Sequence, residues 1–325
     1  TELNPNYADG FNNLGITLKD QDRLDEAIKA YEKALMIKPD YAEVYNNMGN
    51  VFKYQKKLDK AIEAYNKATS LKPDYAESYY NMGATFKNQD KLDEAIEAYK
   101  KAISINPNYV EAYSNMGVAF SKQNKLDEAI LVYNKAVEIK PDYKEVYNYK
   151  GDILKKKGKL NDALDAYYEA LTIKADYPEV YINIGNIFKD QGKWKEAIEN
   201  YNKSLIFKPN YAEAYNNIGN VLKHQYKINK AIEAYHKAIK INPDYGDAYN
   251  NMGFALKDQG KLDQAIKACK KALSLEPNNA DAHRNLSFAL LNKGRLKEGL
   301  DEYEWRLKTT DFILQLRHFT QPLWD

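Results

Sequence analysis

The sequence predicts an all-α solenoid in which antiparallel helix hairpins stack one on the next. The first observation is a Pro-Asp-Tyr or Pro-Asn-Tyr string that returns after 34 residues, or a multiple of 34, from Pro39 to Pro243. The second is that small and apolar residues recur within each period at helical spacing. A fixed period of roughly 20 to 50 residues is typical of repeat architectures, so the chain is read as an array of similar units.

The repeats follow one another without insertion or deletion when Ala8 is taken as repeat position 1. Residues 1–7 are then the end of a preceding truncated repeat, and 8–279 hold eight repeats of 34 residues. Residues 280–308 form a degenerate ninth repeat, and 309–325 a C-terminal capping segment or a linker to a missing domain. Since no initiator methionine is present, we expect the chain to be a segment of a longer protein.

Each repeat is predicted to form a hairpin, with its turn near positions 15–17. Position 8 is glycine and position 20 is alanine in eight of the nine repeats, so the two helix backbones can approach closely. Aromatic rings at positions 4 and 24 fill the space beside this contact, and proline at position 32 ends the second helix. We expect Asp at position 18, such as Asp25, to cap the second helix, and Asp40 and its equivalents to cap the next first helix.

This pattern resembles the tetratricopeptide repeat, with aromatic residues at positions 4 and 24, a Leu-Gly-like pair at 7–8, alanine at 20 and 27, and proline at 32. The resemblance covers residues 8 to about 306. It implies a right-handed superhelix with a concave groove lined by the first helix of each hairpin. Stability would come from stacking, since one hairpin cannot bury its apolar face alone. It also implies a protein interaction scaffold, whose partner is a protein or an extended peptide.

Asparagine at position 6 is the predicted binding residue, since the resemblance places positions 2, 5, 6, 9, 12 and 13 in the groove. Asn is a mediocre helix former, but its amide can pair with both the N–H and the C=O of a peptide unit. Such a ladder resembles the substrate groove of O-linked N-acetylglucosamine transferase. The alternative is that duplication copied a solvated Asn without a function. The eight residues, here called the Asn row, are Asn13, Asn47, Asn81, Asn115, Asn183, Asn217, Asn251 and Asn285.

Two charged rows accompany the Asn row. Position 2 is acidic in all nine repeats, and position 12 is lysine in seven. They could select ligands, but an acid at a helix start and a base near its end also complement the helix dipole, and we favour that interpretation. The acid at position 2 also disfavours the carboxylate clamp by which members of the family bind chaperone C-termini. That clamp has a lysine at position 2.

Repeat five departs from the pattern. Tyr149 takes the place of the row Asn, Lys150 stands at an apolar position, Ala175 replaces the proline and Pro178 opens the next repeat. Either the array has a hinge or a distinct anionic contact here, or the sequence has drifted. We expect the superhelix to deviate at this repeat.

Other function classes have little support. The net charge of +2 argues against a dedicated nucleic-acid binder, and no apolar run approaches the roughly 18 residues that span a bilayer. The single cysteine and four scattered histidines give no metal-ligand spacing, and no catalytic or cofactor motif is present. We therefore predict a cytoplasmic binding segment with no catalytic residue, metal or cofactor.

Two alternative functions remain open. The strings Glu-Tyr-Glu-Trp-Arg-Leu at 302–307 and Phe-Thr-Gln-Pro-Leu-Trp-Asp at 319–325 look like the junction of bacterial tetratricopeptide arrays with a glycosyltransferase-like domain. The chain would then recruit substrates for a larger enzyme. Alternatively, the array is a structural scaffold that self-associates into homo-oligomers.

Overall fold

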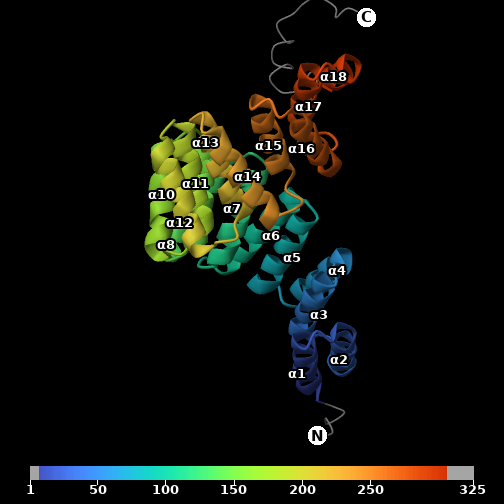
Figure 1. Cartoon of the computed structure of the whole chain (residues 1–325). Helices are drawn as coiled ribbons and strands as arrows, with labels where there is room; N and C mark the ends of the chain where they lie inside the picture. Colours follow the sequence, from blue (N-terminus) through green and yellow to red (C-terminus); the bar gives the residue numbers. More distant parts are fainter. Residues whose placement is uncertain (1–6, 306–325) are drawn as a thin grey trace, which may run out of the picture. The chain divides into compact units, whose positions relative to one another are not determined.

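The computed structural model describes residues 7–305, which form eighteen α-helices and no strand. The chain divides into two compact units, here called unit 1 (Thr1–Ile173) and unit 2 (Lys174–Asp325). Figure 1 shows helices following one another in hairpins along the chain. Residues 1–6 and 306–325, and with them the predicted segment 309–325 and the string at 319–325, lie outside the described residues.

In each hairpin the first helix has 13 residues, and the second has 14 except in the ninth repeat. The helices of unit 1 are α1 (Ala8–Asp20), α2 (Leu24–Ile37), α3 (Ala42–Tyr54), α4 (Leu58–Leu71), α5 (Ala76–Asn88), α6 (Leu92–Ile105), α7 (Val110–Lys122), α8 (Leu126–Ile139), α9 (Lys144–Lys156) and α10 (Leu160–Ile173). Those of unit 2 are α11 (Pro178–Asp190), α12 (Trp194–Phe207), α13 (Ala212–His224), α14 (Ile228–Ile241), α15 (Gly246–Asp258), α16 (Leu262–Leu275), α17 (Ala280–Asn292) and α18 (Leu296–Tyr303).

Within each unit the hairpins stack in sequence order. Every first helix packs against the second helix of its own repeat, and the second helix packs against the first helix of the next. The alanines and tyrosines of the repeat form a series of buried clusters along this stack, because each hairpin needs a neighbour to cover its apolar side. The predicted fold class, an all-α solenoid of antiparallel helix hairpins, is confirmed in both units.

The close contact inside a hairpin has the predicted composition. A Cβ atom added to Gly83 would lie 2.8 Å from the ring of Tyr99 and 3.1 Å from the carbonyl oxygen of Ala95. Position 8 is therefore glycine because the position-24 ring and the backbone at position 20 both press against it. Tyr99 and Ala95 are fully buried, as their equivalents are in most repeats.

The predicted helix caps are wrong in most repeats. The N-cap residue of α2 is Arg23, without a side-chain cap, and Asp25 lies in the first turn, where its Oδ1 accepts a hydrogen bond from Gln55 Nε2 of the next repeat at 2.9 Å. Helix α3 likewise begins at Ala42 after Tyr41, so Asp40 is one residue too early to cap it. Only a residue directly before the helix can reach the free amides of its first turn. Asn279 has that place in α17 and accepts from the Ala282 N–H at 3.0 Å.

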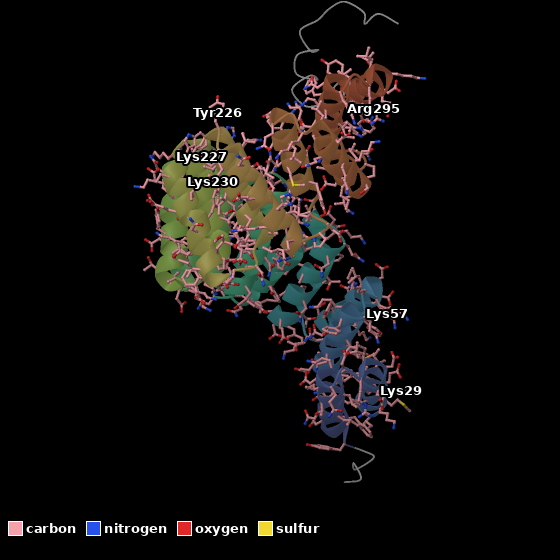
Figure 2. The ribbon with its side chains drawn as sticks, in the orientation of Figure 1. Lys29, Lys57, Tyr226, Lys227, Lys230 and Arg295 are labelled. Atoms are coloured by element: carbon pink, nitrogen blue, oxygen red, sulfur yellow. The ribbon has the colours of Figure 1, made fainter. Side chains whose placement is uncertain are left out.

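The turn between the two helices requires a left-handed backbone at position 15. This residue has a positive φ in all nine described turns; it is glycine in four of them, and Tyr226 has a φ of 58°. A bulky residue rarely adopts this conformation. The Tyr226 side chain is 90% exposed and points away from the ribbon (Figure 2), so no core contact holds it there.

The boundary between the units falls in the irregular repeat. Helix α10 ends at Ile173 and α11 begins at Pro178, and Ala175 stands in the linker where other repeats have proline. The sequence irregularity and the division of the chain therefore coincide.

Candidate functional site

The Asn row lies on the first helices, and its amides bond to the preceding repeat. Asparagines at position 6 donate through Nδ2 to a position-5 asparagine one repeat earlier, which is buried between the two first helices. These bonds are Asn47 to Asn12 Oδ1 (3.0 Å), Asn81 to Asn46 Oδ1 (3.2 Å), Asn251 to Asn216 Oδ1 (3.0 Å) and Asn285 to Asn250 Oδ1 (2.8 Å). The row is thus part of the contact between repeats, which the sequence did not indicate.

Two further members use other acceptors. Asn115 Nδ2 donates to the hydroxyl of Tyr80 at 3.0 Å, because tyrosine replaces asparagine at that position 5. Asn217 Nδ2 lies 3.4 Å from Asn186 Oδ1, at position 9 of the preceding repeat. The hydrogen bond from position 6 to the preceding repeat is therefore kept when a different residue supplies the acceptor.

The members of the row differ in exposure. Asn81, Asn217 and Asn285 are buried, with 8%, 8% and 6% of their surface exposed. Asn13 is exposed, and the remaining four, Asn47, Asn115, Asn183 and Asn251, are half-buried. The row is therefore accessible at some repeats and closed at others.

Position 5 extends the hydrogen-bond network to the tyrosine at position 34, which precedes the next first helix. Asn216 Nδ2 lies 3.5 Å from the hydroxyl of Tyr245, and burial raises the pKa of Tyr245 to about 12. In repeat one the hydroxyl of Tyr41 donates to Asp9 Oδ1 at 2.7 Å, and this bond is the main cause that raises the pKa of Tyr41 to about 12. In the sequence, the polar residues at position 5 and the recurrent tyrosine at position 34 could have indicated this hydrogen-bond network.

Asparagine at position 9 has a role in the core. The hydroxyl of Tyr65 donates to Asn50 Oδ1 at 2.8 Å, and that of Tyr235 donates to Asn220 Oδ1 at 2.8 Å. In repeat one position 9 is Ile16, and the buried hydroxyl of Tyr31 has no partner in the described part of the chain. Burial raises the pKa of Tyr31 to about 12. Position 9 thus decides whether the central tyrosine of a repeat is satisfied.

The charged rows lie at the helix ends. In α3, Glu43 is in the first turn and Lys53 in the last, which suits the helix dipole. Glu43 also forms an ion pair with Lys72 at 3.1 Å. Burial lowers the pKa of Lys53, so this lysine is partly removed from water. The acid at position 2 therefore mainly stabilises the fold, whereas the surroundings of the lysine at position 12 differ from repeat to repeat.

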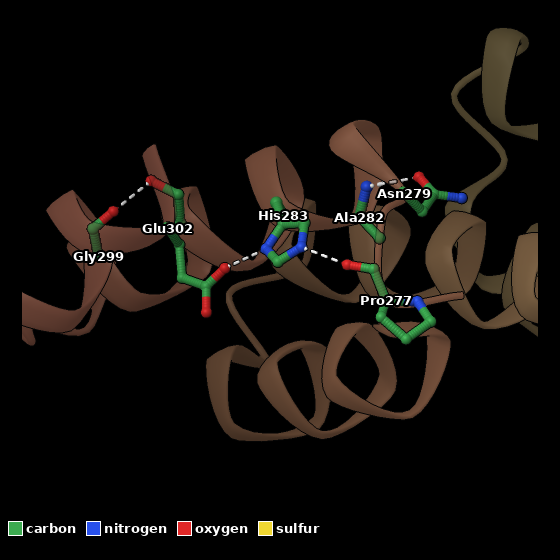
Figure 3. Close-up of polar contacts among 7 residues, drawn as sticks. Pro277, Asn279, Ala282, His283, Gly299 and Glu302 are labelled. Carbon is green, nitrogen blue, oxygen red and sulfur yellow. Dashed lines mark hydrogen bonds and ion pairs between the residues drawn. The ribbon is translucent and has the colours of Figure 1, made fainter. Parts of the chain in front are cut away.

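His283 belongs to a structural cluster at the last hairpin, shown in Figure 3. Its Nε2 lies 2.9 Å from the carbonyl oxygen of Pro277, and its Nδ1 contacts the carboxylate of Glu302. The indole of Trp305 stacks on the imidazole, with ring centroids 3.9 Å apart. The histidine thus takes the place of the aromatic ring that other repeats have at position 4.

Neither a metal centre nor a membrane span emerges between residues 7 and 305. No group of three His, Cys, Asp or Glu side chains there could hold a metal ion. No helix in this range is both long and apolar enough to cross a bilayer.

Comparison with solved structures gives similar repeat proteins. A crystal structure of MamA is 30% identical, with a TM-score of 0.48, over 50% of this chain and 97% of that one. The APC/C hetero-tetramer Cut9-Hcn1 gives a TM-score of 0.60 at 18% identity, over 85% of this chain and 54% of that one. PilF of Pseudomonas aeruginosa gives 0.56 at 19% identity, over 64% and 94%. The last two matches show a common fold.

A search of the curated proteins returned no match. Family models described as TPR repeat match residues 17–55, 49–90, 86–124, 151–192, 185–225 and 225–260, and models described as tetratricopeptide repeat match 110–143, 246–279 and 268–301. These matches cover well over half of the chain, and those at 110–143 and 246–279 coincide with the fourth and eighth repeats found in the sequence. The chain belongs to the tetratricopeptide repeat family.

Proposed function

We propose that this chain is a protein interaction scaffold that holds an extended polypeptide along its first helices through the Asn row. The observation that carries the proposal is that bonds to the preceding repeat fix several row amides in one orientation, as between Asn47 and Asn12 and between Asn251 and Asn216. Amides held in place in this way lose less conformational entropy when a ligand binds.

The bonds between repeats leave the row with unused hydrogen-bonding groups. Each bond uses one of the two Nδ2 hydrogens. The Oδ1 atoms of Asn47 and Asn251 accept no hydrogen bond from another described residue. A peptide unit needs one donor and one acceptor, and the remaining N–H and the Oδ1 supply both. Such recognition reads the backbone of the ligand, so it tolerates many side chains.

The half-buried members are the ones that a ligand can reach. We assign the contact to Asn47 and Asn251, which are half-buried, whereas the more buried Asn81 and Asn285 mainly join the repeats. Asn115 is also half-buried, but its Nδ2 donates to Tyr80 and to the Glu111 carbonyl oxygen and its Oδ1 accepts from Lys87. Tyr149 interrupts the row in repeat five, so this repeat offers no amide at position 6.

The test compares two double variants. One changes Asn47 of unit 1 and Asn251 of unit 2 to alanine; the control changes Asn66 of unit 1 and Asn202 of unit 2, which are exposed on second helices, to alanine. Peptides are selected on the wild-type chain from a random 12-residue phage library, and their affinities are measured by fluorescence anisotropy. We expect a loss of about threefold or more for the row variant, since a hydrogen-bonded contact disappears in whichever unit holds the peptide, and none for the control.

Equal affinities of the two variants would contradict the proposal, and so would a selection that yields no binding peptide. Circular dichroism confirms that both variants remain helical. The recruiting role for a glycosyltransferase-like domain rests on residues at and beyond the end of the described range, so it stays a prediction.

A further inference from the structure

A hollow of about 430 Å³ lies between the first two repeats of unit 1. Its lining comes from repeat positions 9, 12, 13 and 17, most of which are groove positions of the family. The lining residues are Lys19, Asp20, Leu24, Asn50, Lys53 and Tyr54. The hollow is therefore separate from the Asn row but is lined by the ends of α1 and α3, which carry the row, and by the start of α2.

Lys53 is a half-buried ammonium without a counter-ion. It makes no hydrogen bond or ion pair with any described residue. Three other lysines at position 12 pair with an aspartate next to them, Lys19–Asp20 at 3.0 Å, Lys189–Asp190 at 3.5 Å and Lys257–Asp258 at 3.1 Å, but Tyr54 takes this place in repeat two. Burial lowers the pKa of Lys53, and only the charge of Glu77 opposes that effect. A partly desolvated cation of this kind favours an anionic partner.

Asn50 adds a second donor. Its Oδ1 accepts the hydroxyl hydrogen of Tyr65 at 2.8 Å, and its Nδ2 hydrogens have no partner among the described residues. Lys19 is paired with Asp20 at 3.0 Å. The lining therefore has two ammonium groups against one carboxylate, which suits a single negative charge better than a doubly charged phosphate.

We propose that this hollow receives a Glu or Asp side chain of the polypeptide that lies along the first helices. The inference rests on the proposed function and adds a preference for acidic ligands to it. The carboxylate accepts from Lys53 Nζ and Asn50 Nδ2. The methylene groups of the acidic side chain contact Leu24 and the ring of Tyr54, which is 72% exposed at this surface.

The repeat positions that line the hollow in unit 1 carry partly different side chains in repeats six and seven of unit 2. The residues there are Lys189, Asp190, Trp194, Asn220, Lys223 and His224. The rings of Trp194 and His224 stack, with centroids 5.3 Å apart, and thereby join the two positions that Leu24 and Tyr54 hold in unit 1. Lys223 Nζ lies 4.7 Å from the centroid of the Phe254 ring. In unit 2 the protein's own aromatic rings thus contact both Lys223 and His224. The proposal is therefore confined to unit 1.

The experiment uses the full chain and the same random 12-residue phage library. Wild type, Lys53→Met, Lys223→Met and Lys57→Met are each used for selection. Methionine keeps most of the stem of lysine and removes the charge; Lys57 is an exposed lysine of the neighbouring turn (Figure 2). We expect peptides selected on wild type, Lys223→Met and Lys57→Met to be enriched in Glu and Asp, and those selected on Lys53→Met to lack this enrichment.

One selected peptide then enters a double-mutant cycle, in which its Glu or Asp is changed to Gln or Asn. We expect the amide peptide to bind wild type five- to tenfold more weakly, and the two peptides to bind Lys53→Met equally. If the selected peptides show no acidic enrichment, or if the acid-to-amide change has the same effect on wild type and Lys53→Met, the acidic preference is wrong while the scaffold function stands. A selection that yields no peptide overturns both.

Discussion

Tyr226 shows how a single residue of the repeat can be held against its own preference. Its backbone is left-handed at φ 58°, where three other turns of unit 2 have glycine. We expect Tyr226→Gly to raise the free energy of unfolding by about 1 kcal/mol, because the strain disappears and the exposed ring contributes little. Denaturant unfolding measures it. The matched control is Gly260→Ala, which should lower stability by a similar amount; an unchanged or lowered stability of Tyr226→Gly would refute the argument.

The tyrosine at position 24 and the asparagine at position 9 form a second local pair. Asn220→Val leaves the buried hydroxyl of Tyr235 without an acceptor, so we expect a loss of about 1–3 kcal/mol in the free energy of unfolding. In a Tyr235→Phe background the same change should cost much less, because no hydroxyl remains. Equal costs in both backgrounds would show that the hydrogen bond is not the cause.

His224 gives unit 2 a pH dependence. Burial lowers its pKa, and the charges of Lys223 and Lys189 lower it further. A histidine with a lowered pKa in the folded state favours the neutral ring, so the unfolded chain binds the proton more readily. The contribution of His224 to the free energy of unfolding is therefore fully present above the unfolded pKa of roughly 6.5. It is lost as the pH falls through that value toward the folded pKa.

The measurement is thermal unfolding of wild type and His224→Tyr at pH 7.5 and pH 5.0, with tyrosine chosen because repeat two has it at this position. Both proteins lose stability in acid through their carboxylates. We expect the loss to be greater in wild type, and a greater loss in the variant would contradict the assignment.

At the scale of the helix, the hairpins could be predicted and their caps could not. Glycine at position 8 and alanine at position 20 identified the packed faces, since only small residues allow the approach seen at Gly83. The sequence does not fix which residue begins a helix, because Asp25 and Asp40 are good capping types that lie at the wrong places. The bonds of the Asn row were also hidden, since they depend on the register of two neighbouring helices and not on either alone.

Asn279, whose side chain caps α17, allows a direct test of how much a capping residue directly before a helix contributes. Asn279→Ala should lower the stability of the last hairpin by about 1 kcal/mol, because the Ala282 N–H loses its acceptor. Asp40→Ala should have little effect. Hydrogen exchange of the amides of α17 and α3 measures both, and equal effects would show that the cap of α17 contributes nothing.

At the scale of the whole chain, the linker between the units differs chemically from the other connections. Trypsin cleaves after lysine but poorly when proline follows, and Lys38–Pro39 and Lys208–Pro209 have this protection. Lys174 is exposed and followed by Ala175. We expect limited trypsin digestion to cut first after Lys174 and to give fragments that end and begin there. Ala175→Pro is the control, which should abolish this cut; an unchanged pattern in the variant would place the first cut elsewhere.

The hydrogen bonds between repeats also give the array a direction. Asn47, Asn81 and Asn251 each donate to the repeat before them, and none of these donates to the repeat after it. In these amide bonds the N-terminal side of a repeat offers the donor and its C-terminal side the acceptor, although Asn46 and Lys87 donate in the other direction, to Glu77 and Asn115 of the following repeats. Two arrays that repeated the amide bonds of the Asn row between them would meet head to tail, which is a heterologous contact that a twofold-symmetric dimer cannot use.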